Sequence, residues 1–179
     1  MPSAVKLICG MISAEPALFD EVAVDLVNVF GPVEIAGETT PFDFTHYYDE
    51  EMGTPLFRRF LCFGPGFDPG ALADAKLHTN AIEAEYAERF GAALSIRRPL
   101  NLDPGYVEPS KLVLASMKNF SHRVYLGRGV YAEVTLLYRK GRWQPLEWTF
   151  PDYASGRYGT FLSAVRNRLR CPAGGGTGR

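Results

Sequence analysis

Residues 6–32 read KLICGMISAEPALFDEVAVDLVNVFGP, and this stretch decides how the fold begins. The apolar run at residues 6–12 is typical of a central strand. Ser13 is a candidate helix N-cap, and apolar residues then recur at helical spacing over residues 18–29 before a Gly-Pro stop. The stretch therefore predicts a strand followed by a helix.

The next segments continue this alternation. We expect strands at residues 33–44 and 56–63 with a loop or one short helix between them, a helix over residues 68–91 that opens on Asp-Pro, and a strand at residues 94–102. Pro99 places the last strand at an edge of the sheet. The resulting order, βαββαβ, is that of the ferredoxin-like arrangement, in which two helices cover one sheet face.

The second half predicts an antiparallel β meander and a C-terminal helix, which makes the fold class α+β. Asp103-Pro104-Gly105 is a turn, and residues 110–118 form either a short helix or a strand. The further expected elements are strands at 120–126, 130–138 and 143–150 and a helix at 157–169. We expect a single domain over residues 1–170 and a disordered, Gly-rich tail at 171–179.

Composition favours a soluble protein of ordinary size and excludes several classes. The chain has 179 residues, 19 Lys and Arg against 20 Asp and Glu, and a net charge of −1, so we expect no bulk nucleic-acid binding. The three cysteines, Cys9, Cys62 and Cys171, form no CxxC pair, which fits a reducing cytoplasm. No signal segment and no membrane-spanning run is visible, so the predicted location is cytoplasmic.

Charged residues interrupt the predicted strand at 56–63. Alternation places Arg58 on one face and Arg59 on the other, and each face is otherwise apolar. A buried charge is costly unless it is paired. We therefore expect a salt bridge to Asp43, Glu50 or Glu51, one face of the strand exposed to solvent, or an anionic ligand that meets one of the guanidinium groups.

Two further segments combine polar residues in the same way. Lys76, Asn80 and Glu83 share one face of the predicted second helix, which is either a solvated face or a ligand contact. The segment RRPLNLDPGYVEPSK at residues 97–111 places many polar side chains at the end of a strand, where loops carry function. The alternative for this segment is an Asx-turn in which Asp103 caps its own backbone.

The predicted hairpin contributes His122, Arg123 and Glu133. His122 alternates with apolar residues, so it is either a hydrogen-bonded core residue or a proton-transfer residue that titrates near neutral pH. Arg123 and Glu133 are expected to pair across the hairpin.

Common catalytic and cofactor motifs are absent from the sequence. There is no phosphate loop, no G-x-G-x-x-G after a strand, no G-x-S-x-G elbow, and no H-E-x-x-H or Cys/His cluster. Neither His78-Thr79-Asn80 nor His122-Arg123-Val124 fits the H-x-S/T motif of two-histidine phosphodiesterases. A carboxylate-bound Mg²⁺ has no support from spacing, so we assign no metal and no cofactor.

Seven sequence blocks, in order, carry a family resemblance. They are PFDFTHYYDEEMG, PLFRRFL, ADAKLHTNAIE, NLDPGY, SKLVLASMKNFSHRVYL, GVYAEVTLLYRKG and QPLEWTFPDY. Together they resemble the prokaryotic family called domain of unknown function 4416, over nearly the whole chain. Some relatives carry a GTP-binding label, but this sequence has neither a phosphate loop nor an N-K-x-D motif. The resemblance therefore implies no catalytic residues.

The leading hypothesis is a polar cleft that binds an anionic small molecule, a nucleotide or a phosphorylated metabolite, with His122 as the proton-transfer residue if catalysis occurs. The candidate ligand-binding residues are Asp43, Tyr47, Tyr48, Glu51, Arg58, Arg59, Lys76, Asn80, Arg97, Asn101, Asp103, Tyr106, Lys111, Lys118, Arg123, Tyr131 and Glu133. The rival hypothesis is a non-enzymatic interaction domain, in which charges pair off internally and the aromatic loop from His46 to Met52 meets a protein partner. This hypothesis predicts an exposed apolar patch. Edge strands of the meander are compatible with a homodimer.

Overall fold

The predicted opening is present in the computed structural model, which describes residues 5–170. Strand β1 (Val5–Ser13) is buried along most of its length, and helix α1 (Ala17–Phe30) follows it. The N-cap is Pro16 rather than Ser13. The Ser13 hydroxyl instead accepts a hydrogen bond from the Glu15 N–H at 2.9 Å, ahead of the helix, and donates one to the Pro99 carbonyl. The strand and the helix are confirmed, and the predicted cap is wrong.

The other elements follow in chain order: β2 (Val33–Ala36), β3 (Thr40–Pro41), α2 (Asp49–Met52), β4 (Phe57–Phe67), a 3₁₀ turn (Pro69–Ala71), α3 (Leu72–Leu94), β5 (Asn101–Val107), β6 (Lys111–Ser116), β7 (Val124–Gly127), β8 (Val130–Arg139), β9 (Arg142–Pro145), α4 (Pro151–Ala154) and α5 (Gly159–Arg170). Within residues 5–170, no helix is both long and apolar enough to cross a bilayer.

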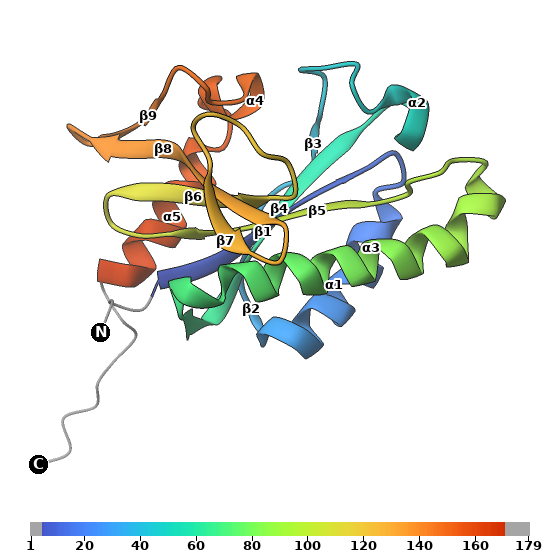
Figure 1. Cartoon of the computed structure of the whole chain (residues 1–179), viewed down its shortest axis with the longest axis horizontal. Coiled ribbons are helices and arrows are strands. Elements are labelled where there is room, and N and C mark those ends of the chain that lie inside the picture. The colour runs from blue at the N-terminus through green and yellow to red at the C-terminus, as the bar shows by residue number, and fades with distance from the viewer. Residues whose placement is uncertain (1–4, 171–179) are drawn as a thin grey trace, which may run out of the picture.

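The strands form one antiparallel sheet with the order β2-β4-β1-β5-β6-β8-β7, while β3 pairs with β4 and β9 pairs with β8. Helices α1 and α3 lie side by side on one face (Figure 1). Helix α5 packs on the opposite face. Strand β4 shows why both faces need cover: Leu61 and Phe63 pack into the cluster beneath α1 and α3, whereas Phe60 and Cys62 pack into the cluster beneath α5.

Two boundaries in the first half differ from the prediction. The strand expected at residues 33–44 is divided into β2 and β3, and the Gly37 N–H between them bonds to the Phe60 carbonyl at 2.8 Å. Residues 45–53, expected to form a loop or one short helix, contain the short helix α2, which confirms the helix alternative. Helix α3 continues to Leu94 and ends at Ser95, whose φ of 56° is left-handed.

The largest correction concerns the strand expected at residues 94–102 and the turn expected after it. The observed strand is β5, which lies between β1 and β6 rather than at an edge of the sheet. The predicted turn residues Asp103-Pro104-Gly105 lie inside this strand. The ladder to β6 begins only at Gly105, so Pro104 lies beside an unpaired part of that edge. Gly105 is needed there because a Cβ would lie 2.4 Å from the Val113 carbonyl oxygen.

The second half is strand-rich as expected, with different pairing. Residues 110–118 form strand β6, which settles the helix-or-strand alternative. Strand β6 pairs with one edge of β8, and β7 and β9 pair with opposite ends of the other edge, so the simple meander is wrong. The strands expected to begin at residue 120 and to end at residue 150 are shorter, and α4 follows β9. The predicted tail at 171–179 lies outside the described residues.

Candidate functional site

A buried network of charged side chains lies where β4 and β5 begin, and Arg58 is its centre. The Arg58 guanidinium donates to Asp152, just inside α4, and to Asp103 on β5 at 3.1 Å. The Asn101 amide also donates to Asp103, at 2.8 Å. Arg58 is 3% exposed. The prediction that an enclosed arginine needs a carboxylate is confirmed, but the expected partners, Asp43, Glu50 and Glu51, are wrong.

Two side chains of α3 complete this network by bonding to the open edge of β5. The Lys76 ammonium donates to the Leu102 carbonyl at 2.7 Å and lies 3.7 Å from Asp103. The Glu83 carboxylate accepts from the Leu102 N–H at 2.7 Å. Here β6 has diverged from β5, so the two side chains replace the missing strand. The interpretation of this helix face as solvated is therefore wrong.

The charges of this network cancel. Arg98 donates to Glu83 at 3.0 Å and to the Asn101 side chain. The cations are Arg58, Lys76 and Arg98, and the anions are Glu83, Asp103 and Asp152. Every cation thus has a carboxylate partner inside the protein, which leaves no positive charge in excess for an anionic ligand.

The surroundings of Arg58 maintain its charge. Burial alone lowers the pKa of Arg58, but its acidic surroundings, the Asp152 and Asp103 carboxylates among them, outweigh burial and raise that pKa above its ordinary value. Burial also raises the pKa of Tyr48, next to the network, to about 12, so its hydroxyl is neutral at physiological pH. Two polar atoms within the described part of the network, Arg58 Nε and the Tyr153 hydroxyl, are buried without a hydrogen-bond partner.

A second, smaller network surrounds Glu133 on β8. The buried Glu133 carboxylate accepts from Arg123 Nε at 2.7 Å and lies 3.1 Å from His122 Nε2. Arg123 also donates to the Ser116 hydroxyl at 2.9 Å. The predicted pairing of Arg123 with Glu133 is confirmed. His122 is hydrogen-bonded and only slightly exposed, so its position matches the core-residue alternative more closely than an open catalytic site.

The remaining predicted residues do not join either network. Arg59 bonds to Asp20 at 2.5 Å, Lys111 bonds to Glu108 at 2.5 Å, and Lys118 bonds to the Tyr47 hydroxyl at 2.5 Å. The others are dispersed as follows: Asp43 beside Arg157, Arg97 beside Glu50, Glu51 exposed, Asn80 half-buried on α3, Tyr106 half-buried on β5, and Tyr131 packed against Tyr125. The predicted ligand set is therefore divided among separate local pairs.

An apolar surface lies on and beside β7 at the end of the sheet. Three consecutive residues of β7 are exposed, with Val124 at 67%, Tyr125 at 58% and Leu126 above 40%. Phe120 and Trp148 are also exposed, and the centroids of their rings lie 5.6 Å and 5.1 Å, respectively, from the centroid of the His122 ring. We call the surface of Phe120, His122, Val124–Leu126 and Trp148 the aromatic edge.

A shallow depression adjoins the aromatic edge and is lined by Ser121, His122, Glu147 and Trp148. The Trp148 indole N–H donates to the Val134 carbonyl at 2.8 Å, which fixes the ring against β8 between the segments paired with β7 and β9. The His122 and Trp148 rings are nearly parallel, at 8°. The depression therefore has a rigid aromatic wall and an exposed carboxylate.

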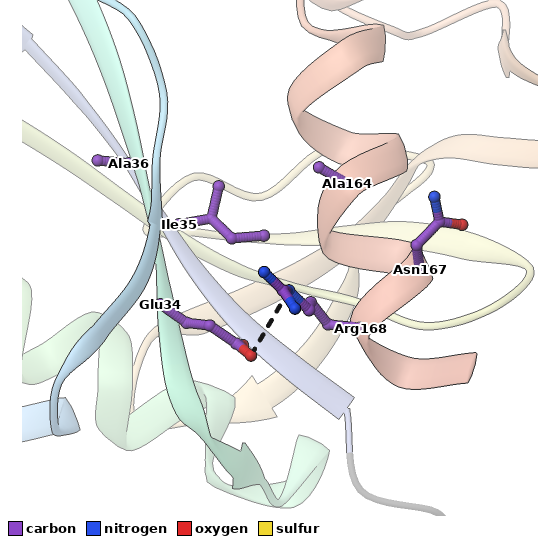
Figure 2. Close-up of a pocket in the computed structure, with 6 residues that line it drawn as sticks. All are labelled: Glu34, Ile35, Ala36, Ala164, Asn167 and Arg168. Atoms are coloured by element: carbon purple, nitrogen blue, oxygen red, sulfur yellow. Dashed lines mark ion pairs between the residues drawn. The ribbon is translucent and has the colours of Figure 1, made fainter. Parts of the chain in front are cut away.

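A second depression lies between the opposite edge strand, β2, and α5. Figure 2 shows Glu34, Ile35 and Ala36 on the strand and Ala164, Asn167 and Arg168 on the helix, with the Glu34 and Arg168 side chains pointing toward each other. Their closest N–O distance is 3.7 Å, and Lys6 lies 2.7 Å from the same carboxylate. Two cations, Lys6 and Arg168, therefore share the Glu34 carboxylate, and Arg168 is the one that lines the depression.

Several of these residues were absent from the sequence prediction. Asp152 follows a Phe-Pro pair in what was expected to be a loop, and no local pattern links it to Arg58, 94 positions earlier. Trp148 and Glu147 were placed in a strand. The exposed strand did have a detectable signal in the sequence, because the three uncharged residues Val124–Leu126 precede a Gly-rich turn. Strand alternation, however, wrongly implied that one face of this strand was covered.

The family of the chain follows from comparison with known proteins. The family model described as a domain of unknown function (DUF4416) matches residues 3–169, which is nearly the whole chain. No curated protein and no solved structure matches the chain. The chain belongs to the DUF4416 family.

Proposed function

We propose that this chain is a non-enzymatic protein-interaction domain that binds an extended segment of another protein along the free edge of β7. The observation that carries the proposal is the exposure of Val124–Leu126 at the end of the sheet. Successive residues of a strand point to opposite faces, so exposure of all three means that neither face of β7 is covered. The outer backbone N–H and C=O groups of β7 also have no partner strand among residues 5–170.

The charges near β7 support this reading. Exposed edge strands usually carry charges that prevent pairing with other chains. Arg123, the residue before β7, turns its charge inward to Glu133, and the next charged residue is Arg128 in the turn. The edge between them presents only uncharged side chains, which favours pairing with an added strand through main-chain hydrogen bonds.

The buried networks support the same choice over an anionic ligand in a central cleft. Arg58, Lys76 and Arg123 were among the predicted anion contacts, and each is neutralised by a carboxylate of this chain. A network whose charges are matched internally holds its elements in place without a ligand. The aromatic edge, which adjoins the Glu133 network, is the exposed apolar surface that an interaction domain requires.

Peptide selection tests the proposal without a known partner. A phage library of random twelve-residue peptides is selected on the wild-type protein, and the dissociation constants of enriched peptides are measured. The Val124→Lys, Leu126→Lys double variant is expected to weaken binding at least about tenfold, because two apolar contacts are lost and lysine disfavours strand addition. Val24→Lys, which replaces an exposed valine on α1, is the matched control and should bind like wild type.

The outcomes distinguish the possible occupants of the edge. Peptides that bind the double variant as tightly as wild type would contradict the proposal. Sedimentation of the wild type at rising concentration provides a second arm. A dimer that the double variant abolishes would identify the occupant as a second copy of this chain, and the proposed heterologous partner would then be wrong.

The depression between β2 and α5 favours a second candidate function, which is the binding of an anionic small molecule. Its support is that two cations, Lys6 and Arg168, lie beside one carboxylate, Glu34, and that Arg168 lines the depression. Titration with inorganic phosphate tests it: a saturable rise in melting temperature that Arg168→Gln reduces is expected. An equal rise in that variant would contradict the assignment.

We also propose that residues 5–107 form a ferredoxin-like unit and that the protein is cytoplasmic. The strand order β2-β4-β1-β5, with α1 and α3 on one face, supports the first proposal. The two buried cysteines, Cys9 and Cys62, are free thiols, which supports a reducing compartment.

A further inference from the structure

We propose that the depression lined by His122 and Trp148 receives an arginine side chain of the segment bound at β7. This inference rests on the proposed function, since it names a chemical feature of the same partner. The depression lies next to the strand that the segment would extend, because His122 precedes Val124, the first residue of β7, by two positions. A segment paired with β7 therefore passes the depression at the start of that strand.

The aromatic wall of the depression fits a planar cation. A guanidinium group is attracted to the face of an indole ring, which is the strongest of the aromatic partners. Trp148 is 38% exposed and its ring is fixed by the hydrogen bond to the Val134 carbonyl. His122 packs parallel to that ring and is itself fixed by Glu133. The wall is therefore preformed, and the entropy cost of ordering it is already met.

The charge of the depression has the sign that a cation needs. The Glu133 carboxylate beneath His122 is matched by Arg123, so this buried pair contributes no net charge. Glu147 lines the depression and has no ion pair or side-chain hydrogen bond within residues 5–170. The exposed, unpaired Glu147 carboxylate beside the exposed Trp148 indole is thus complementary to a ligand with one positive charge. The Ser121 hydroxyl adds a hydrogen-bond acceptor.

The test uses a small probe, so it does not depend on strand addition at β7. The chain has two tryptophans, and the indole N–H signals of Trp143 and Trp148 are assigned in a ¹⁵N-labelled sample with the Trp143→Phe variant. N-acetyl-arginine amide is titrated, and N-acetyl-citrulline amide, which has the same shape without the charge, is the matched probe. We expect a saturable shift of the Trp148 signal with the arginine compound only.

The variants report on the role of each group. Glu147→Gln should weaken the arginine compound about two- to fivefold, which is the range for an exposed ion pair. Glu15→Gln, at another exposed carboxylate, should leave its affinity unchanged. Equal shifts with arginine and citrulline compounds, or no saturable shift of the Trp148 signal, would overturn the inference. Either result would leave strand addition at β7 standing, because the selected peptides test that separately.

Discussion

Replacement of Arg58 by methionine should destabilise the fold strongly, because it leaves the Asp152 carboxylate buried without a cation. The Asp152 side chain is 5% exposed, and its other described hydrogen bond comes from the Tyr158 hydroxyl at 3.3 Å. Removal of one partner from a buried ion pair costs about 3–5 kcal/mol. This is a large part of the roughly 5–15 kcal/mol by which domains are stable. Urea unfolding followed by circular dichroism measures the loss.

Two further variants make the result specific to the buried pair. Asp152→Asn in the Arg58→Met background removes the unpaired charge, so the double variant should be at least about 2 kcal/mol more stable than Arg58→Met alone. Arg59→Met is the control one position along, since its partner Asp20 is mostly exposed and such pairs are worth about 0–1 kcal/mol. A loss below about 1 kcal/mol for Arg58→Met, or no recovery in the double variant, would refute the reasoning.

Three other predictions concern single sites. Burial raises the pKa of Glu83, so the ionisation of Glu83 costs stability as pH rises above its unfolded pKa; the free energy of unfolding of Glu83→Gln should therefore rise relative to that of wild type as pH increases from about 4.5, and an opposite trend in urea unfolding would contradict this. Gly105→Ala should lower the free energy of unfolding by about 1–3 kcal/mol in the same assay, because the alanine Cβ would meet the backbone of β6. An unchanged stability would mean that β5 and β6 do not approach closely at this position. In a Cys171→Ser background, Cys9 and Cys62 should resist a thiol reagent until the protein unfolds, because burial raises the pKa of both thiols; rapid native labelling would show that they are accessible.

The parts of the fold that were predicted correctly depend on local patterns. The strand at β1 and the helices α1, α3 and α5 follow from apolar spacing and from Gly and Pro at their ends. Boundaries were wrong where long-range contacts outweigh local signals. Asp103-Pro104-Gly105 has turn chemistry, yet β1 on one side and β6 on the other hold it extended. A sequence pattern contains no information about that pairing.

The candidate site shows the same division. Strand alternation correctly predicted that one of the two arginines, Arg58 or Arg59, is enclosed and that Arg123 pairs with Glu133, since both depend on neighbours within one strand or one hairpin. The carboxylate that meets Arg58 was missed because Asp152 reaches it only through the path of α4 across the sheet. The exposure of β7 was also missed, because whether a layer covers a strand is a property of the whole fold.

Backbone amide hydrogen exchange, measured by NMR with and without the tightest selected peptide, tests the proposed interaction most directly. If an extended segment adds to the sheet at β7, the amides within Val124–Gly127 that point away from β8 should exchange more slowly in the complex, and β2 at the opposite edge should be unchanged. Slowed exchange at β2, or unchanged exchange at β7 with the peptide bound, would contradict the proposal.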